Sequence, residues 1–223
     1  MTFETLEARF DELRKEAAGF DAQLDDFFKA DETLRFQVCI PQNDQAGPPG
    51  VLIYISPKPG ARMPESWAEV LNKQNLVWVG AEESGNEVHV ARRVGFAQLA
   101  TTVARRFSAI NEEQIYLSGF SGGGRVASMM MPAYPDAYAG ALFICGANPM
   151  FTATPETIES LSNTPMTFLT GTGDFNLEDT QMAITTYQQA GLSAVQLQIV
   201  DGLGHALPDA ADLDIALGHL SRF

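Results

Sequence analysis

A serine between glycines is the residue of this sequence whose type and spacing most directly indicate covalent chemistry. The run Gly119-Phe-Ser-Gly-Gly123 has the pattern Gly-x-Ser-x-Gly and stands between an apolar stretch and a helix-forming stretch. At such a strand-to-helix turn the serine backbone is strained, its hydroxyl is exposed, and flanking side chains larger than glycine would collide with neighbouring elements. We therefore predict Ser121 as a nucleophile and the N–H of Gly122, at the start of the helix, as an oxyanion donor.

A glycine-rich phosphate loop or a plain tight turn is the alternative interpretation of this run. No Lys followed by Ser or Thr comes after it, and its glycine spacing does not fit a dinucleotide-binding fingerprint. The pattern therefore favours a nucleophile. A serine hydroxyl also needs a base to accept its proton, and the base needs a carboxylate to fix its tautomer.

Three histidines could supply the base. His205 lies in a glycine-lined loop directly after the last apolar run, so it falls at the carboxyl end of a predicted strand, where ligands of α/β sheets bind. His89 opens a long predicted helix and His219 lies late in the C-terminal helix, and both positions suit a surface or packing role. We predict His205 as the base.

The carboxylate is expected between nucleophile and base in the chain, the order found in serine hydrolases with this type of turn. Asp174 fits, because it follows the apolar run 166–170 and a glycine break. Asn176 is a neighbour that could order this loop. Asp201 is only the second choice for the acid, because it lies too close to His205 in the same loop.

Seven short β-rich runs must position these residues. They alternate with helical stretches, and several are apolar throughout, which is typical of strands buried on both faces of a mainly parallel sheet. The runs span residues 34–40, 51–55, 76–79, 114–117, 141–145, 166–170 and 195–200, and the helical stretches span residues 65–73, 88–107, 123–134, 155–161, 177–190 and 210–220. We predict a single doubly wound α/β fold of about seven strands with helices on both faces. Only residues 146–165 separate the fifth and sixth runs, so we expect no large cap domain.

The N-terminal region has a different pattern. From Phe3 to Phe28 apolar residues recur every three or four positions, which predicts an amphipathic helix, or two helices broken near Gly19. We therefore expect an N-terminal helical extension over residues 1–30 and the α/β domain over residues 31–223.

Composition excludes several classes of partner. The chain has 14 Lys plus Arg against 28 Asp plus Glu, a formal net charge of −14. Nucleic-acid phosphates and anionic lipid surfaces repel such a chain, so we expect no nucleic-acid partner. No apolar run approaches the roughly 18 residues that a membrane span needs.

The cysteines and the N-terminus add further expectations. Cys39 and Cys145 are far apart in the sequence and form neither a metal-ligand cluster nor a disulfide framework, so we expect free thiols, no metal and no cofactor. The first residues lack the basic start and apolar stretch of a signal peptide. As written, the sequence suits the cytoplasm; a signal peptide removed from it would instead mean a periplasmic or secreted protein. It does not indicate an oligomeric state.

The motifs together resemble the α/β-hydrolase superfamily, specifically its polyhydroxybutyrate depolymerase and feruloyl or acetyl esterase-like branch. The resemblance rests on the Gly-Phe-Ser-Gly-Gly turn at Ser121, the Gly-Thr-Gly-Asp turn at Asp174 and the Gly-His-Ala-Leu-Pro loop at His205, in that order. The stretch 76–86 and its continuation to Ile144-Cys-Gly also resemble bacterial serine hydrolases described as esterases or phospholipases. The resemblance covers residues 34–223 and implies hydrolysis of an ester without a cofactor.

One departure from this family concerns the oxyanion hole. Relatives usually carry His-Gly and a small residue after the third strand, and a backbone amide there completes the hole. Here the strand runs into Tyr54-Ile-Ser-Pro-Lys-Pro-Gly60, and the proline at position 57 has no N–H. We therefore expect the second donor to be the amide of Ser56 or Lys58, or the hydroxyl of Ser56.

We expect a shallow, open substrate site lined by Phe120, Glu83 and Asn86. The carboxylates of loop 82–86 would disfavour anionic substrates, and without a cap the site suits short, neutral or aromatic acyl esters rather than triglycerides or phospholipids. The leading hypothesis is a serine esterase that acts on a small-molecule ester through an acyl-enzyme. The alternatives are a serine peptidase or amidase, and a non-catalytic binding protein on a hydrolase fold.

Overall fold

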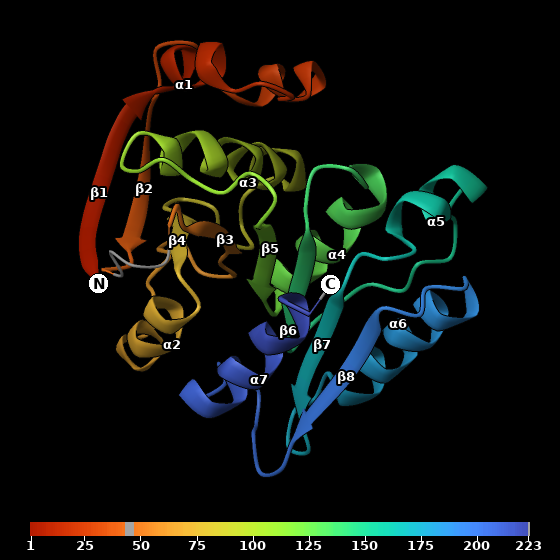
Figure 1. The fold of residues 1–223 in the computed structure, drawn as a ribbon. Helices are drawn as coiled ribbons and strands as arrows, with labels where there is room; N and C mark the ends of the chain where they lie inside the picture. Colours follow the sequence, from red (N-terminus) through yellow and green to blue (C-terminus); the bar gives the residue numbers. More distant parts are fainter. Residues whose placement is uncertain (43–46, 223) are drawn as a thin grey trace. The chain divides into compact units, whose positions relative to one another are not determined.

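The computed structural model describes residues 1–42 and 47–222. Backbone contacts divide the chain into two compact units, Met1–Ile115 and Tyr116–Phe223, and each unit is described by itself. Both combine strands with helices, as Figure 1 shows.

The described residues of the first unit form four strands in the order β1-β2-β4-β3. Their bounds are β1 (Thr2–Arg9), β2 (Thr33–Ile40), β3 (Gly50–Ile55) and β4 (Leu76–Ala81), and the helices of this unit are α1 (Phe10–Glu16), η1 (Ala22–Phe27), η2 (Glu65–Trp67), α2 (Ala68–Lys73) and α3 (Val90–Arg105). Strand β3 runs parallel to β4, whereas β2 is antiparallel to both β1 and β4. Every residue of β3 and β4 is buried, because these strands are covered on both faces.

Strand β1 corrects the prediction of a helix from residue 3 onward. Residues Thr2 to Arg9 pair with β2 along their whole length, from Thr2 opposite Ile40 to Arg9 opposite Thr33. The three-residue spacing of Phe3 and Leu6 fits a helix, but pairing with β2 satisfies the backbone groups of this segment and overrides the local pattern. Helical structure begins only at Phe10. The domain boundary expected between residues 30 and 31 stays a prediction.

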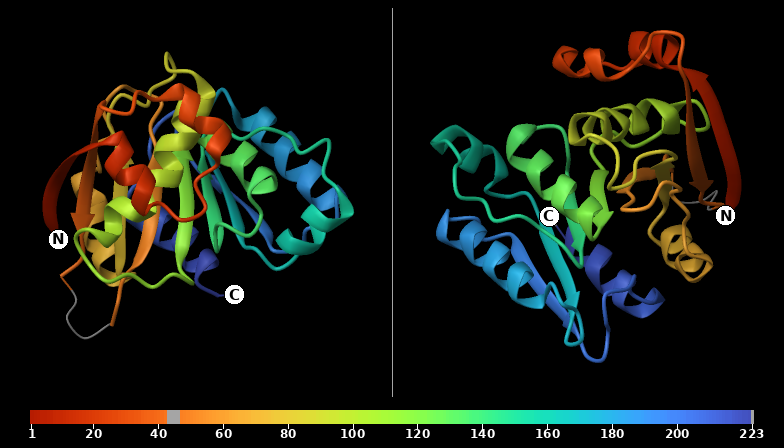
Figure 2. Two further views of the ribbon diagram at one scale, coloured as in Figure 1. Left: turned by 90° about the horizontal axis from the view of Figure 1, so that it is seen from above. Right: turned by 180° about the vertical axis from the view of Figure 1, so that it is seen from behind.

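As far as residue 222, the second unit has four parallel strands in the order β5-β6-β7-β8. Their bounds are β5 (Ile115–Phe120), β6 (Gly140–Ile144), β7 (Met166–Gly171) and β8 (Val195–Val200), and the helices are α4 (Gly122–Ala133), α5 (Pro155–Leu161), α6 (Leu177–Gln189) and α7 (Ala210–Leu220). In Figure 2, α7 lies on one face of these strands and α6 on the other. Phe143, Phe168 and Tyr187 pack together in this core, with the rings of Phe143 and Phe168 4.9 Å apart.

The predicted α/β fold class is confirmed. All seven predicted runs are strands, the six helical stretches predicted from residue 65 onward are present within a few residues of their expected bounds, and β1 is the eighth strand of the described residues. The segment between β6 and β7 holds only the short helix α5, as expected without a cap domain. Within the described residues, no helix has the length and apolar character to span a membrane.

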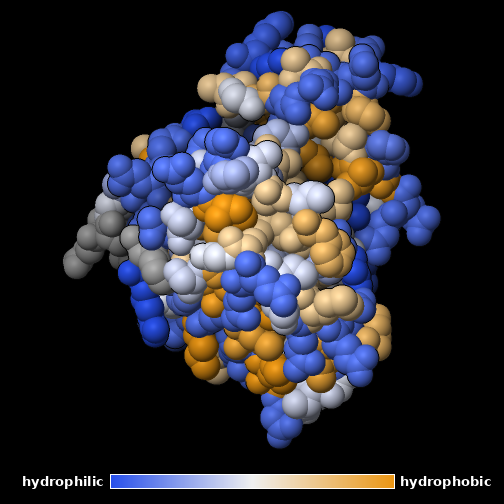
Figure 3. Space-filling model, turned by 90° about the vertical axis from the view of Figure 1, so that its right-hand side faces the viewer, coloured by the Kyte–Doolittle hydropathy of each residue, from blue (hydrophilic) through white to orange (hydrophobic). Residues whose placement is uncertain are grey.

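A few large hydrophobic side chains remain at the surface. The two most exposed among the described residues are Phe175 and Phe151, with 77% and 76% of their area accessible. Figure 3 shows hydrophobic areas among hydrophilic side chains on one face of the molecule.

Candidate active site

The turn that carries Ser121 joins β5 to α4. Ser121 has φ 54° and ψ −120°, a left-handed conformation that is costly for a residue with a side chain. A Cβ added at Gly119 would lie 2.4 Å from the carbonyl carbon of Gly123, and one added at Gly124 would lie 2.2 Å from the oxygen of Gly146. Glycine is therefore required around this turn for steric reasons, as the sequence pattern predicts.

The structure brings Ser121, His205 and Asp174 together from three separate segments. His205 lies in the loop after β8, with Nε2 2.9 Å from Ser121 Oγ and Nδ1 2.8 Å from Asp174 Oδ1. Asp201, the other candidate acid, accepts a hydrogen bond from the hydroxyl of Thr172 instead. In a neutral imidazole with the proton on Nδ1, Nδ1–H donates to the carboxylate and Nε2 accepts the serine proton.

The carboxylate of Asp174 is buried, and both of its oxygens have hydrogen-bond partners. Its Oδ2 accepts from the hydroxyl of Thr170 at 2.8 Å, and its Oδ1 accepts from the backbone N–H of Asn176 at 3.0 Å. Burial by itself raises the pKa of Asp174, but its hydrogen bonds lower the pKa by more, so it falls below the usual value of 3.8. Asp174 is thus held as the anion that a neighbouring imidazolium requires.

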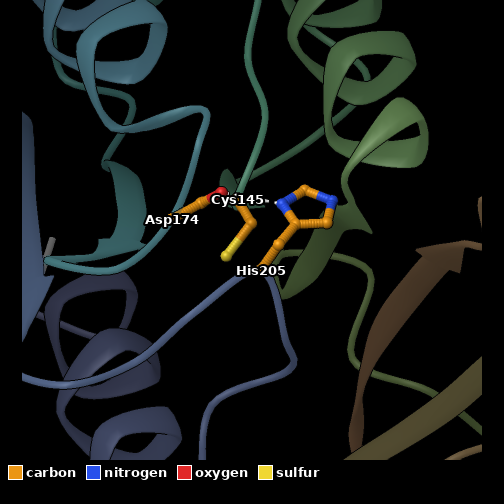
Figure 4. A group of neighbouring side chains, drawn as sticks. All are labelled: Cys145, Asp174 and His205. Atoms are coloured by element: carbon orange, nitrogen blue, oxygen red, sulfur yellow. Dashed lines mark hydrogen bonds and ion pairs between the residues drawn. The ribbon is translucent and has the colours of Figure 1, made fainter.

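Cys145, which follows β6, lies beside this pair. Figure 4 shows its side chain with those of Asp174 and His205, and one potential ligand atom from each residue lies within 4.8 Å of the others. Such a trio could in principle hold a metal ion. However, burial and the neighbouring carboxylate of Asp174 raise the pKa of Cys145, so the thiol stays protonated, and both imidazole nitrogens already face hydrogen-bond partners. This donor set fits a hydrogen-bonded network better than a metal site.

Asn176 forms hydrogen bonds with both Asp174 and Cys145. Its side-chain amide donates to the carbonyl oxygen of Cys145 at 2.8 Å, while its backbone N–H donates to Asp174. The ordering role expected of Asn176 thus has a structural basis. Thr170 and Cys145 were not predicted as parts of the site, because their contacts with Asp174 depend on the fold and on no local motif. Both Cys39 and Cys145 are free thiols, as expected.

Two phenylalanine rings flank the imidazole of His205. The ring centre of Phe120 lies 5.0 Å from that of His205, and the ring centre of Phe175 lies 4.1 Å away with a tilt of 31°. Phe120 is predicted to bind substrate and lies next to His205, and its role stays a prediction. Phe175 was not predicted; its position directly after Asp174 is the only signal in the sequence.

The predicted oxyanion donors belong to different units. Gly122 is the first residue of α4, so its N–H has no acceptor within the helix. Ser56 and Lys58 follow β3 in the first unit, where the N–H of Lys58 donates to Ser56 Oγ at 3.0 Å and that hydroxyl donates to the carbonyl of Gly60. The Lys58 amide and the Ser56 hydroxyl are therefore engaged within their own loop. The oxyanion roles of Gly122, Ser56 and Lys58 stay predictions.

Glu83 and Asn86 also lie in the first unit, in the loop after β4. Their backbone N–H groups donate to the carbonyls of Pro59 and Pro57. The buried Arg93 joins the same two loops, because its guanidinium donates to the carbonyls of Ser84 and Ser56 at 2.8 and 2.9 Å. The substrate-binding roles of Glu83 and Asn86 stay predictions.

The other two histidines have structural contacts. His89 caps α3 by accepting from the N–H of Ala91, and it stacks on Phe27. His219 bonds to the carbonyl of Ala194 through Nε2.

The parallel strands, the turn at Ser121 and the loops after β7 and β8 define an α/β hydrolase. Residues 63–221 match the family model described as phospholipase/carboxylesterase. The match covers more than half of the sequence, so the chain belongs to the phospholipase/carboxylesterase family, and the superfamily expected from the motifs is confirmed. A search of curated proteins gave no significant match.

Several solved structures are similar in fold. A ferulic acid esterase is 13% identical, with 97% of this chain and 96% of that chain covered and a TM-score of 0.65. Est1E from Butyrivibrio proteoclasticus is 13% identical, with 85% and 96% covered and a TM-score of 0.62. The S-formylglutathione hydrolase FrmB from Staphylococcus aureus is 11% identical, with 99% and 97% covered and a TM-score of 0.61. At such low identity these similarities establish the fold alone.

Proposed function

We propose that this hydrolase is a serine esterase that cleaves carboxylic esters through an acyl-enzyme. The observation that carries the proposal is the continuous hydrogen-bonded series from Asp174 through His205 to Ser121, with distances of 2.8 and 2.9 Å. These distances are those of a base within reach of the proton that it must accept and of an acid that orients the base. The family to which the chain belongs supports the same chemistry.

The proposed reaction has two halves. In the first, Ser121 Oγ attacks the ester carbonyl carbon while His205 Nε2 takes the hydroxyl proton, and the negative charge on the carbonyl oxygen faces the N–H of Gly122. The bond to the alcohol oxygen then breaks, and Nε2 returns the proton to the leaving alcohol. In the second half, water attacks the acyl-enzyme, Nε2 takes a proton from the water, and the carboxylic acid leaves as Nε2 protonates Ser121 Oγ. Asp174 stays ionised and stabilises the imidazolium.

A fluorophosphonate probe tests this proposal directly. We expect covalent labelling of the wild-type protein and none of Ser121→Ala. Ser160→Ala, which removes an exposed serine hydroxyl on α5, is the matched control and should label like the wild type. Labelling of folded Ser121→Ala, or no labelling of the wild type, would contradict the proposal and favour a non-catalytic binding protein. Hydrolysis of a p-nitroanilide but of no p-nitrophenyl ester would favour the amidase alternative.

We further propose that the substrates are short or aromatic acyl esters. The support is the segment between β6 and β7, which offers one seven-residue helix and no larger cap that could enclose a long acyl chain. Initial rates on p-nitrophenyl acetate, butyrate and palmitate test this preference. We expect kcat/KM to be highest for acetate or butyrate, and a steady rise with chain length would contradict the proposal.

A further inference from the structure

Phe175 is an exposed aromatic residue between two buried, hydrogen-bonded neighbours. It is 77% accessible, while its neighbours Asp174 and Asn176 are only 5% and 8% accessible. Hydrogen bonds hold both neighbours: Asp174 accepts from Thr170, and Asn176 donates to the carbonyl of Cys145. The backbone of Phe175 is therefore anchored on either side, although its ring extends into solvent.

The ring of Phe175 is also oriented. It contacts the imidazole of His205 with 4.1 Å between ring centres and a tilt of 31°, and the ring centre of Phe120 lies 5.0 Å from the same imidazole. Most of its remaining surface contacts no other residue of the described chain, so the ring gains little from burial. An exposed aromatic side chain that contacts the imidazole of a candidate active site, between two anchored neighbours, is well placed to contact a bound ligand.

The position of this ring relative to the reacting atoms indicates what it can contact. His205 Nε2 lies 2.9 Å from Ser121 Oγ, and a reacting carbonyl carbon must approach that oxygen to about 3 Å. The groups attached to the carbonyl then come close to the rings beside the imidazole. Aromatic rings attract one another in offset-stacked or edge-to-face arrangements with centres about 4.5–7 Å apart, beyond the gain from buried area.

We propose that Phe175, together with Phe120, forms an aryl-binding surface that makes this site prefer esters with an aromatic ring over saturated esters of the same shape. This inference rests on the proposed esterase function and names the residue that selects the substrate.

Matched ester pairs test the proposal. Methyl phenylacetate and methyl cyclohexylacetate differ in the aromaticity of the acyl ring, while their carbonyl carbons are similarly reactive because neither ring is conjugated to the carbonyl. Benzyl acetate and cyclohexylmethyl acetate make the same comparison on the alcohol side. For the wild type we expect kcat/KM to favour the aromatic member of at least one pair by about 3- to 10-fold.

Variants then assign this preference to Phe175. We expect Phe175→Leu to lower the aryl-to-cyclohexyl ratio towards one, with Phe120 accounting for any preference that remains, and Phe175→Tyr to keep the wild-type ratio. Phe3→Leu, which replaces a similarly exposed phenylalanine on β1, is the matched control and should keep the wild-type ratio. Because Phe175 is exposed, we expect its variants to fold like the wild type, and thermal unfolding checks this point.

Each of the following outcomes would overturn the inference. A wild-type ratio near one, or an unchanged ratio in Phe175→Leu, contradicts it while leaving the esterase proposal intact. Loss of the ratio in Phe151→Leu but not in Phe175→Leu would assign aryl binding to the apolar hollow of about 600 Å³ beside α5, which Phe151 lines. No hydrolysis of any ester, with no labelling by fluorophosphonate, would contradict the proposed function and this inference together.

Discussion

Ser121, His205 and Asp174 lie within hydrogen-bonding distance of one another in series, so we expect them to act together in one proton transfer. His205 can activate Ser121 only while its Nε2 lies near the hydroxyl, and the 2.8 Å contact with Asp174 holds it there. We therefore expect Ser121→Ala and His205→Ala each to lower kcat by about 10³-fold or more, and the double variant to lower it little further. Initial rates on p-nitrophenyl acetate measure all three. If the two losses in kcat multiply in the double variant, the two residues act independently, which contradicts this geometry.

The pKa of Asp174 gives a prediction for stability against pH. Hydrogen bonds hold this pKa below the usual 3.8, so the ionised carboxylate stabilises the folded state above about pH 4, and this contribution is lost as the pH falls through the lower folded-state pKa. Asp174→Asn lacks the contribution at every pH. We expect the difference in free energy of unfolding between wild type and variant to be largest near pH 6 and to shrink towards pH 3. Urea titrations across this range measure it, and a constant difference would contradict the assignment.

Some neighbours within the candidate site can be expected from the sequence, and others cannot. Ser121, Asp174 and His205 could be predicted to lie together because each stands in a glycine-bounded turn after a strand, and their catalytic roles stay predictions. Phe175, Cys145 and Thr170 could not, because an exposed aromatic ring and a buried thiol or hydroxyl have no characteristic spacing. Their relation to the site arises only when β6 and β7 lie side by side.

At the scale of elements, the close approach of β5 to α4 determines which side chains the turn at Ser121 tolerates. A Cβ at Gly119 would lie 2.4 Å from backbone atoms of Gly123, which cannot move away as a flexible side chain can. We expect Gly119→Ala to destabilise the fold by about 1–3 kcal/mol or more, by overpacking, and to lower activity by displacing Ser121. Urea unfolding measures the loss.

Gly218→Ala is the matched control for this prediction. Gly218 lies within α7, and a Cβ there would meet no atom within 4 Å. Alanine is the better helix former by about 1 kcal/mol, so this variant should be as stable as the wild type or more stable. Equal destabilisation of both variants would mean that loss of glycine flexibility, and not the contact with Gly123, is responsible.

The elements themselves were predictable to different degrees. Several of the seven β-rich runs were found because strands buried on both faces are apolar throughout, as β3 and β4 are. Strand β1 was missed because it lies at one end of the strand order, and only Ala8 among its residues is buried. With so few buried positions its sequence lacks a strand pattern, and pairing with β2 decides its conformation.

At the scale of the whole molecule, net charge should influence which esters reach the site. The formal charge of −14 repels anionic substrates, and ions screen this repulsion over about 30 Å at 0.01 M salt but only about 8 Å at 0.15 M. We expect kcat/KM for the anionic p-nitrophenyl hemisuccinate, relative to that for neutral p-nitrophenyl acetate, to rise as salt increases between these concentrations. A ratio independent of salt would mean that charge does not control access.

The two buried thiols have a consequence for following the unfolding of this protein. Cys39 belongs to the unit Met1–Ile115 and Cys145 to the unit Tyr116–Phe223, and both are buried and free. Each unit thus contains one of the two buried thiols, and each thiol can react with an alkylating reagent only when the structure around it opens. Peptide mapping after timed alkylation in increasing urea would give a separate opening free energy for each half of the chain. Equal values would indicate one cooperative unfolding reaction, and different values would indicate which half opens first.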